Sequence, residues 1–230
     1  MGFAGNSWDR LLKPDFLEEA LMWSEHQRTK HTVYPETENV LKAFELTPPE
    51  KTRVVIIGQD PYPGVGADGI PHAHGLAFST KSTTVPQSLQ NIFAELDYLY
   101  GYKRQHGDLT DWAKQGVLLL NTSLTVQAGK PASHRNKFWD RVTVNAIRAL
   151  SISVKRIVFM LWGRDAQAME PYISKPGNHR ILKAPHPSPL SAHTGFYGCG
   201  HFAIANQHIL TMAEYPQSTY NRSHLPITWV

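Results

Sequence analysis

The sequence predicts an α/β fold, a three-layer α/β/α sandwich around a short central parallel four-stranded sheet. Four apolar runs supply the strands, at residues 54–57, 117–120, 157–161 and 180–183. Polar or aromatic residues of a chemically useful kind follow each run at once. The connections between the runs are long and carry helical periodicity, as parallel strands require.

Helices are expected in the long connections and near both ends of the chain. Residues 8–25 carry apolar side chains at helical spacing, and residues 40–44 form a second short helix. Pro86 opens an amphipathic helix, because proline is favoured in the first turn. Residues 111–115 lead into the second strand, and further helices are expected at residues 138–150, 165–172 and 200–212. No repeat or linker interrupts the chain, so residues 1–230 are predicted to form a single domain.

Size and composition favour one globular domain with a large core, since the chain has 230 residues and 41% hydrophobic content. The single cysteine, Cys199, excludes a disulfide framework, a four-cysteine zinc site and a four-cysteine iron–sulfur cluster. There is no run of eighteen apolar residues, no myristoylation signal and no secretory apolar segment. The sequence therefore predicts a cytoplasmic protein, bacterial or viral in type, with no membrane partner.

The charge is unevenly distributed along the chain. The net charge is +4, but residues 1–50 hold 5 basic and 9 acidic side chains, whereas residues 131–230 hold 11 basic and 4 acidic. A basic carboxyl-terminal half is typical of a protein with an anionic partner near its last two strands. An ordinary solvated surface is the alternative explanation.

The first strand ends in a dense motif at residues 58–63, Gly-Gln-Asp-Pro-Tyr-Pro. Glycine and two prolines stop the strand abruptly, so Asp60 and Tyr62 are expected on a stiff loop at its carboxyl end. Open α/β sheets bind their ligands at that edge. Taken alone, Asp60 could also cap the turn through its own backbone.

A second dense motif, His-Pro-Ser-Pro-Leu-Ser, occupies residues 186–191 after the last strand. Together with residues 58–63, Phe78-Ser79 and Asn121, it makes the chain resemble the family 1 uracil-DNA glycosylases. The resemblance covers nearly the whole chain in the family's order, including residues 116–122, 161–163 and 196–199. It implies an enzyme that flips uracil out of DNA, hydrolyses the N-glycosidic bond and leaves an abasic site for base excision repair.

The resemblance implies a role for each residue of the uracil pocket. Asp60 orients the attacking water and stabilises the cationic sugar, while His186 donates a hydrogen bond to uracil O2 as a neutral imidazole. Backbone N–H groups around Gln59 assist at O2. Three further side chains contact the base. Phe78 stacks on the uracil ring, Asn121 forms hydrogen bonds with its edge, and Tyr62 excludes the methyl group of thymine.

The resemblance also implies a set of DNA contacts. Leu190 is the wedge that enters the space vacated by the flipped base. Phosphate contacts are expected from hydroxyl and imidazole side chains, namely Ser88, Ser188, Ser191 and His134. Arg164 stands where the family commonly has serine, and we expect it to act as a cationic phosphate contact. Further departures are Pro63 in place of histidine, Thr194 in place of arginine and a longer loop over residues 64–72.

Two other functions are open to this sequence. Twelve histidines would permit a metallohydrolase, but neither His72 with His74 nor His193 with His201 matches a known ligand motif. A non-catalytic uracil-DNA-binding replication accessory factor is the main alternative. The family implies no cofactor and no metal, a monomer, single- and double-stranded uracil-containing DNA as substrate, and a DNA-mimicking protein inhibitor as a further partner.

Overall fold

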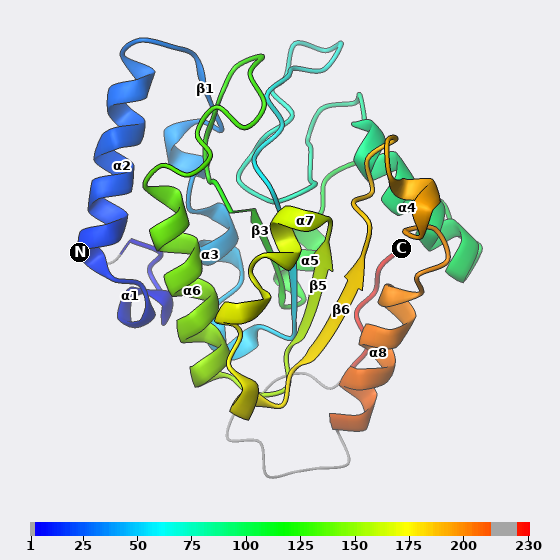
Figure 1. Cartoon of the computed structure of the whole chain (residues 1–230). Coiled ribbons are helices and arrows are strands. Elements are labelled where there is room, and N and C mark those ends of the chain that lie inside the picture. The colour runs from blue at the N-terminus through cyan, green and yellow to red at the C-terminus, as the bar shows by residue number, and fades with distance from the viewer. Residues whose placement is uncertain (1–2, 213–224) are drawn as a thin grey trace.

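The structure is a computed structural model and describes residues 3–212 and 225–230 of the chain. Its central sheet has four parallel strands in the order β3-β2-β5-β6 (Figure 1). The strands are β2 (Val54–Gly58), β3 (Val117–Asn121), β5 (Val158–Trp162) and β6 (Arg180–Ala184). All residues of β2, β3 and β5 are buried, which is why these strands read as continuous apolar runs in the sequence. The prediction of a parallel four-stranded sheet is confirmed.

Helices cover both faces of the sheet, with α2 and α6 on one side and α4 and α8 on the other (Figure 1). The α-helices are α1 (Trp8–Leu11), α2 (Pro14–Arg28), α3 (Lys42–Leu46), α4 (Gln87–Tyr100), α5 (Thr110–Lys114), α6 (Trp139–Ser153), α7 (Arg164–Gln167) and α8 (His201–Met212). Single 3₁₀ turns lie at Thr37–Asn39, Pro49–Lys51, Glu170–Tyr172, Lys175–Gly177 and Ala192–Thr194. The sandwich predicted from the sequence is therefore present.

Two predicted helices are each divided in the structure. The segment at residues 8–25 breaks before Pro14, because a proline disfavours helical backbone at the residue preceding it, and Lys13 is extended. The segment at residues 165–172 is α7 followed by a separate 3₁₀ turn that contains Pro171. Proline at these positions outweighs the helical periodicity of the flanking residues.

A small second sheet was not predicted. It pairs β1 (Val33–Tyr34) with β4 (Val126–Gln127) in antiparallel register. Two residues per strand are too few to give a periodic pattern, so the sequence carried no signal for it. Among the described residues, no helix combines the length and the apolar character needed to cross a bilayer.

The parallel register brings four strand ends to one edge of the sheet. Gly58 lies opposite Asn121, and Trp162 lies opposite Ala184, so the loops that follow all four strands start at one level. The segments after β2, β3, β5 and β6 are those in which the sequence places its polar motifs. The fold thereby collects residues from distant parts of the chain at a single site.

Candidate active site

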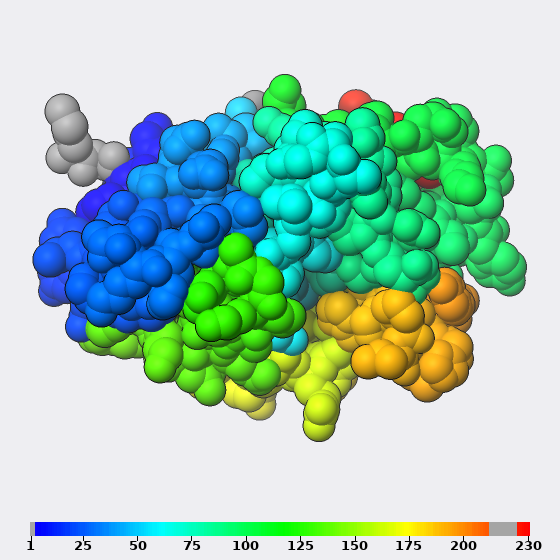
Figure 2. Space-filling view, turned by 90° about the horizontal axis from the view of Figure 1, so that it is seen from above, coloured from blue at the N-terminus to red at the C-terminus, as the bar shows by residue number. Residues whose placement is uncertain are grey.

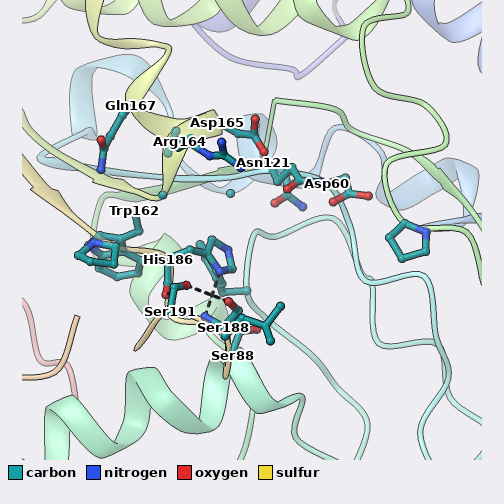
Figure 3. A pocket seen from close by; sticks show the side chains of 18 of the residues that line it. Asp60, Ser88, Asn121, Trp162, Arg164, Asp165, Gln167, His186, Ser188 and Ser191 are labelled. Carbon is teal, nitrogen blue, oxygen red and sulfur yellow. Dashed lines mark hydrogen bonds between the residues drawn. The ribbon is translucent and has the colours of Figure 1, made fainter. Parts of the chain in front are cut away.

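A cleft of about 1130 Å³ opens at the carboxyl ends of the strands. Figure 2 shows this end of the molecule hollowed between the segments that follow β2, β3 and β6. All the site residues predicted from the sequence except His134 line the cleft: Gln59, Asp60, Tyr62, Phe78, Ser88, Asn121, Arg164, His186, Ser188, Leu190 and Ser191. The side chains of Asp60, Asn121 and His186 are among those drawn in Figure 3.

Asn121 is fixed at the end of β3 by its neighbour strand. A Cβ atom on Gly58 would lie only 2.1 Å from Asn121 Oδ1, so the amide can occupy its place only because residue 58 is glycine. The N–H groups of Thr122 and Ser123 both donate to the Gln59 carbonyl, at 3.1 and 3.0 Å, and lock the two loops together. The result is a buried amide on a strand end whose backbone is held by the neighbouring loop.

Asp60 lies on the loop after β2 and is held by the opposite loop. The backbone N–H of Ala132 donates to Asp60 Oδ2 at 2.7 Å. Burial raises the pKa of this carboxyl above its ordinary value, although the Ala132 bond and the charge of Arg135 oppose that shift. Burial therefore disfavours the anionic form of Asp60, and a cation placed beside the carboxylate would stabilise that form.

Tyr62 forms a rigid wall because both sides of its hydroxyl are bonded. The hydroxyl donates to the Phe78 carbonyl at 3.2 Å and lies 2.8 Å from Ser88 Oγ. Since a phenol has one proton, Ser88 must be the donor in the second bond. Burial raises the pKa of Tyr62 above its ordinary value, so the phenol stays neutral.

Phe78 has left-handed backbone with φ at +63°, which is uncommon for a residue with a side chain. Its ring contacts Trp162 and His186, with centroid separations of 5.6 and 5.7 Å. Strained backbone of this kind persists where the surroundings over-determine it, and it concentrates at ligand sites. The ring is thereby held at the cleft wall.

His186 follows β6 and presents one defined tautomer. The Ser188 N–H donates to His186 Nδ1 at 3.0 Å, so Nδ1 is an acceptor and the single proton of the neutral ring is on Nε2. Burial lowers the pKa of the imidazole below its ordinary value, although Asp165 opposes the shift. A Cβ atom on Gly163 would lie 2.8 Å from His186 Cβ, so glycine there leaves room for the ring.

The loop after His186 displays Leu190 to solvent, with 89% of the residue exposed. The loop is braced internally, since Ser191 Oγ donates to the His186 carbonyl at 2.7 Å and lies 3.0 Å from Ser188 Oγ. An exposed leucine on a braced loop is a protruding apolar tip. The two serine hydroxyls are therefore close to the cleft and to each other (Figure 3).

His134 lies apart from the cleft lining and is almost fully buried. Its Nδ1 is 2.8 Å from Thr125 Oγ1, which itself accepts from Trp139 Nε1 at 2.7 Å. Nδ1 of His134 is therefore engaged inside the protein, and burial lowers the pKa of the ring to about 4. In the structure, His134 therefore does not lie with the other predicted site residues in the cleft lining.

Several cleft residues were missed from the sequence. Asp165, Gln167 and Lys183 all line the cleft. Gln167 Nε2 donates to the Ala184 carbonyl at 3.0 Å, and Asp165 pairs with Arg135. Asp165 and Gln167 lie on α7, which follows the end of β5, and Lys183 lies near the end of strand β6, so their only signal was closeness to a strand end.

Comparison with known proteins agrees with this geometry. Residues 44–210 match the model of the Uracil DNA glycosylase superfamily. The chain is 45% identical over 217 residues to a uracil-DNA glycosylase of Enterococcus faecalis, covering 92% of this chain and 93% of the relative. It is 49% identical over 197 residues to a uracil-DNA glycosylase of Coxiella burnetii, covering 85% of this chain and 83% of that one.

Solved structures of uracil-DNA glycosylases also resemble this chain. The structure superposes on a single-residue variant of mimivirus UNG, crystallised in complex with UGI, with a TM-score of 0.81 and 27% sequence identity. The match covers 95% of this chain and 89% of the mimivirus chain. With a family model spanning most of its length and relatives above 40% identity, the chain belongs to the uracil-DNA glycosylase superfamily.

Proposed function

We propose that this chain removes uracil from DNA through the cleft residues described above, releasing free uracil and leaving an abasic site. Uracil excision is the activity of the family to which the chain belongs. One observation carries the residue assignment: a buried amide, a partly buried carboxylate and an imidazole whose Nδ1 accepts from a backbone N–H line a single cleft. A base cannot be hydrolysed inside the duplex stack, so the nucleotide has to be flipped into this cleft.

Two charges develop as the glycosidic bond breaks. The sugar becomes cationic, and Asp60 would stabilise it and orient the attacking water. The departing uracil becomes anionic, and the Nε2–H of His186 would donate to uracil O2. The Ser188 bond to Nδ1 supports this role because it keeps the donating proton on the opposite nitrogen. Backbone N–H groups around Gln59 would assist at the same oxygen.

Uracil selection would rest on two separate filters. The Asn121 amide would accept from uracil N3–H and donate to O4, a pattern that cytosine presents in reverse. Such mismatched buried groups give rejection on the order of 10⁴–10⁵-fold. Thymine pairs as uracil does, so Tyr62 would exclude it by filling the space of the 5-methyl group.

Tyr62→Ala is expected to admit thymine, raising its excision relative to that of uracil by at least about tenfold, since the variant removes the wall against one methyl group. Tyr62→Phe is the matched control, because it keeps the ring and loses only the hydroxyl bonds. Release of free thymine from a thymine-containing duplex is the readout. If Tyr62→Ala still removes uracil and shows no gain on thymine, this residue is not the filter.

The DNA grip would come from Leu190, Ser188, Ser191 and Arg164 at the rim of the cleft. Ser88 and His134 are proposed as further phosphate contacts. Ser88 already donates to Tyr62, which leaves its oxygen free only as an acceptor, so a phosphate contact would require that bond to open. His134 could offer only its Nε2 side, because Nδ1 is already bonded to Thr125.

Arg164→Ala is expected to lower the log–log salt slope of DNA binding by roughly 1, because a real phosphate contact releases counterions. Arg164 is exposed at the start of α7 and lines the cleft. Arg148→Ala, an exposed arginine on α6 outside the cleft lining, is the control and should leave the slope unchanged. Equal slopes for wild type and Arg164→Ala would make Arg164 a surface residue without a DNA role.

The rate of uracil excision is expected to fall at acid pH. Activity requires an ionised Asp60 and a neutral His186, and both are lost as pH falls. Burial raises the pKa of Asp60 above its ordinary value, so the rate should begin to fall at a higher pH than an unperturbed aspartate would give. Burial lowers the pKa of His186, so its ring stays neutral to a lower pH than an ordinary histidine. Single-turnover rates measured across acid pH would show this fall, and a rate that increases as pH drops would contradict a neutral His186.

The further proposals concern partners and setting. Single- and double-stranded uracil-containing DNA are proposed as substrates of a monomer acting in the cytoplasm. A DNA-mimicking inhibitor is proposed as a protein partner, supported by the mimivirus relative crystallised with UGI. A single domain over residues 1–230 is supported by α1 and α2, which contact α6, and by Trp229, whose carbonyl accepts from Trp112 Nε1 at 3.1 Å.

The activity is tested by incubating the purified chain with a uracil-containing oligonucleotide in excess chelator. Alkaline cleavage then reports abasic sites. We expect free uracil and one cleavage position per uracil. Tight binding to uracil-DNA without release of base would favour the replication accessory factor instead.

A further inference from the structure

Helix α4 buries two polar side chains one turn apart on the face that it turns towards the protein. Asn91 is 6% exposed and Glu95 is 1% exposed. A buried carboxylate is costly unless it is fully bonded, and none of the ion pairs between described residues involves Glu95. Neither residue lines the cleft, so the proposed chemistry does not account for them.

Glu95 is bonded to the backbone of the segment beyond the Leu190 loop. Its Oε2 accepts from the Gly198 N–H at 2.6 Å, and its Oε1 accepts from the Gly200 N–H at 2.9 Å. The Cys199 thiol lies between them, with Sγ 3.8 Å from Oε1. Because the donors are backbone groups, the carboxylate fixes the course of the chain at residues 198–200.

Asn91 is bonded to the near side of the same loop. Its Nδ2 donates to the Pro187 carbonyl at 2.8 Å in a buried contact. Gln87 Nε2, one turn earlier on α4, donates to Asn91 Oδ1 at 3.2 Å and orients the amide. The loop between residues 187 and 198 is therefore anchored to one helix at both ends.

We propose that Asn91 and Glu95 form a clamp on α4 that positions Leu190 for insertion into duplex DNA. Leu190 lies between the two anchor points, and Figure 1 shows α4 beside the segment that follows β6. The inference rests on the proposed role of Leu190 as the wedge. Asn91 and Glu95 are positioning residues, since they act through the loop without touching the substrate.

A side chain that inserts between stacked base pairs, as is proposed for Leu190, must be held in place by its loop. A loop that is fixed before binding loses little conformational freedom on insertion, so more of the contact energy remains for flipping the base. Single-stranded DNA has no opposing stack, and its uracil reaches the cleft with far less help. Loosening the clamp should therefore slow excision from duplex and leave excision from single strands nearly unchanged.

The test compares single-turnover uracil release from one oligonucleotide, either single-stranded or in a duplex. Glu95→Gln keeps the shape of the side chain and removes its charge, so one backbone N–H faces an amide donor. We expect a loss of about tenfold on duplex, the size expected for one weakened charge-assisted hydrogen bond. On single strands the rate should stay within about twofold. Asp97→Asn, the same chemical change at an exposed position of α4, should alter neither rate.

The Leu190→Ala variant shows how much duplex excision depends on Leu190 itself. If the clamp acts through Leu190, adding Glu95→Gln to Leu190→Ala should cause no further loss on duplex. Equal losses of Glu95→Gln on both substrates, or no loss on either, would overturn the clamp. Should Glu95→Gln fail to fold, Asn91→Ser tests the near anchor with the carboxylate intact, and the same duplex-selective loss is expected. If Leu190→Ala itself shows no duplex-selective loss, the wedge assignment fails, and that outcome is distinct from failure of the clamp alone.

Discussion

Asp60→Asn is expected to lower the rate of uracil release by roughly 10³-fold, or about 4 kcal/mol of barrier, while leaving the affinity for uracil-containing DNA within about threefold. Asparagine can still accept the Ala132 N–H through its side-chain oxygen, so the loop geometry should persist. Only the negative charge is lost, and that charge matters chiefly once the sugar has become cationic.

Single-turnover rates and equilibrium binding of the same duplex separate these effects. Asp15→Asn, an exposed carboxylate on α2, is the matched control and should behave as wild type. A comparable loss in rate and in DNA affinity would assign Asp60 to binding or folding. Wild-type rates for Asp60→Asn would remove it from the reaction altogether.

Asn121→Asp is expected to release cytosine, a base that the native chain leaves in DNA. The new carboxylate accepts from the cytosine amino group, where the native amide donates to uracil O4. Because the native mismatch is worth on the order of 10⁴-fold or more, even partial relief should make cytosine release measurable. Uracil release should fall in the same variant, since its O4 would face an acceptor.

The contacts of Asn121 favour this outcome. No hydrogen bond between residues that the structure describes uses the Asn121 amide, which leaves it available to a ligand. Gly58 leaves the same space for an aspartate as for an asparagine. Free cytosine measured from a cytosine-containing strand is the readout, with Asn145→Asp on α6 as the control for the chemical change. If Asn121→Asp still removes uracil and never releases cytosine, the base edge is read elsewhere.

Strands β2, β3 and β5 could be predicted because burial on both faces of a parallel sheet makes each of them a local apolar run. Strand β6 is partly exposed, and the motif that follows it helped to locate it. The division of two helices at Pro14 and near Pro171 is also a local effect that proline position encodes. The pairing of β1 with β4 depends on contacts between residues more than ninety positions apart, and two-residue strands leave no pattern.

The site was predictable where a motif fixes its own geometry. The Ser188 bond to His186 Nδ1 lies within one short loop, so the motif carries its own tautomer control. The position of His134 could not be predicted in this way. The orientation of its ring depends on Thr125 and on Trp23 of α2, which are distant from it in the sequence or lie on another element. The Ser88 bond to Tyr62 and the Arg135–Asp165 pair likewise join segments that only the folded chain brings together.

A crystal structure of the Asp60→Asn variant bound to a uracil-containing duplex tests the central claim most directly. We expect an extrahelical uracil against Phe78, with its N3–H and O4 at the Asn121 amide and its O2 at Nε2 of His186. Leu190 should occupy the gap left in the duplex. A uracil that remains stacked in the helix, or one bound away from Asn121, would contradict the account.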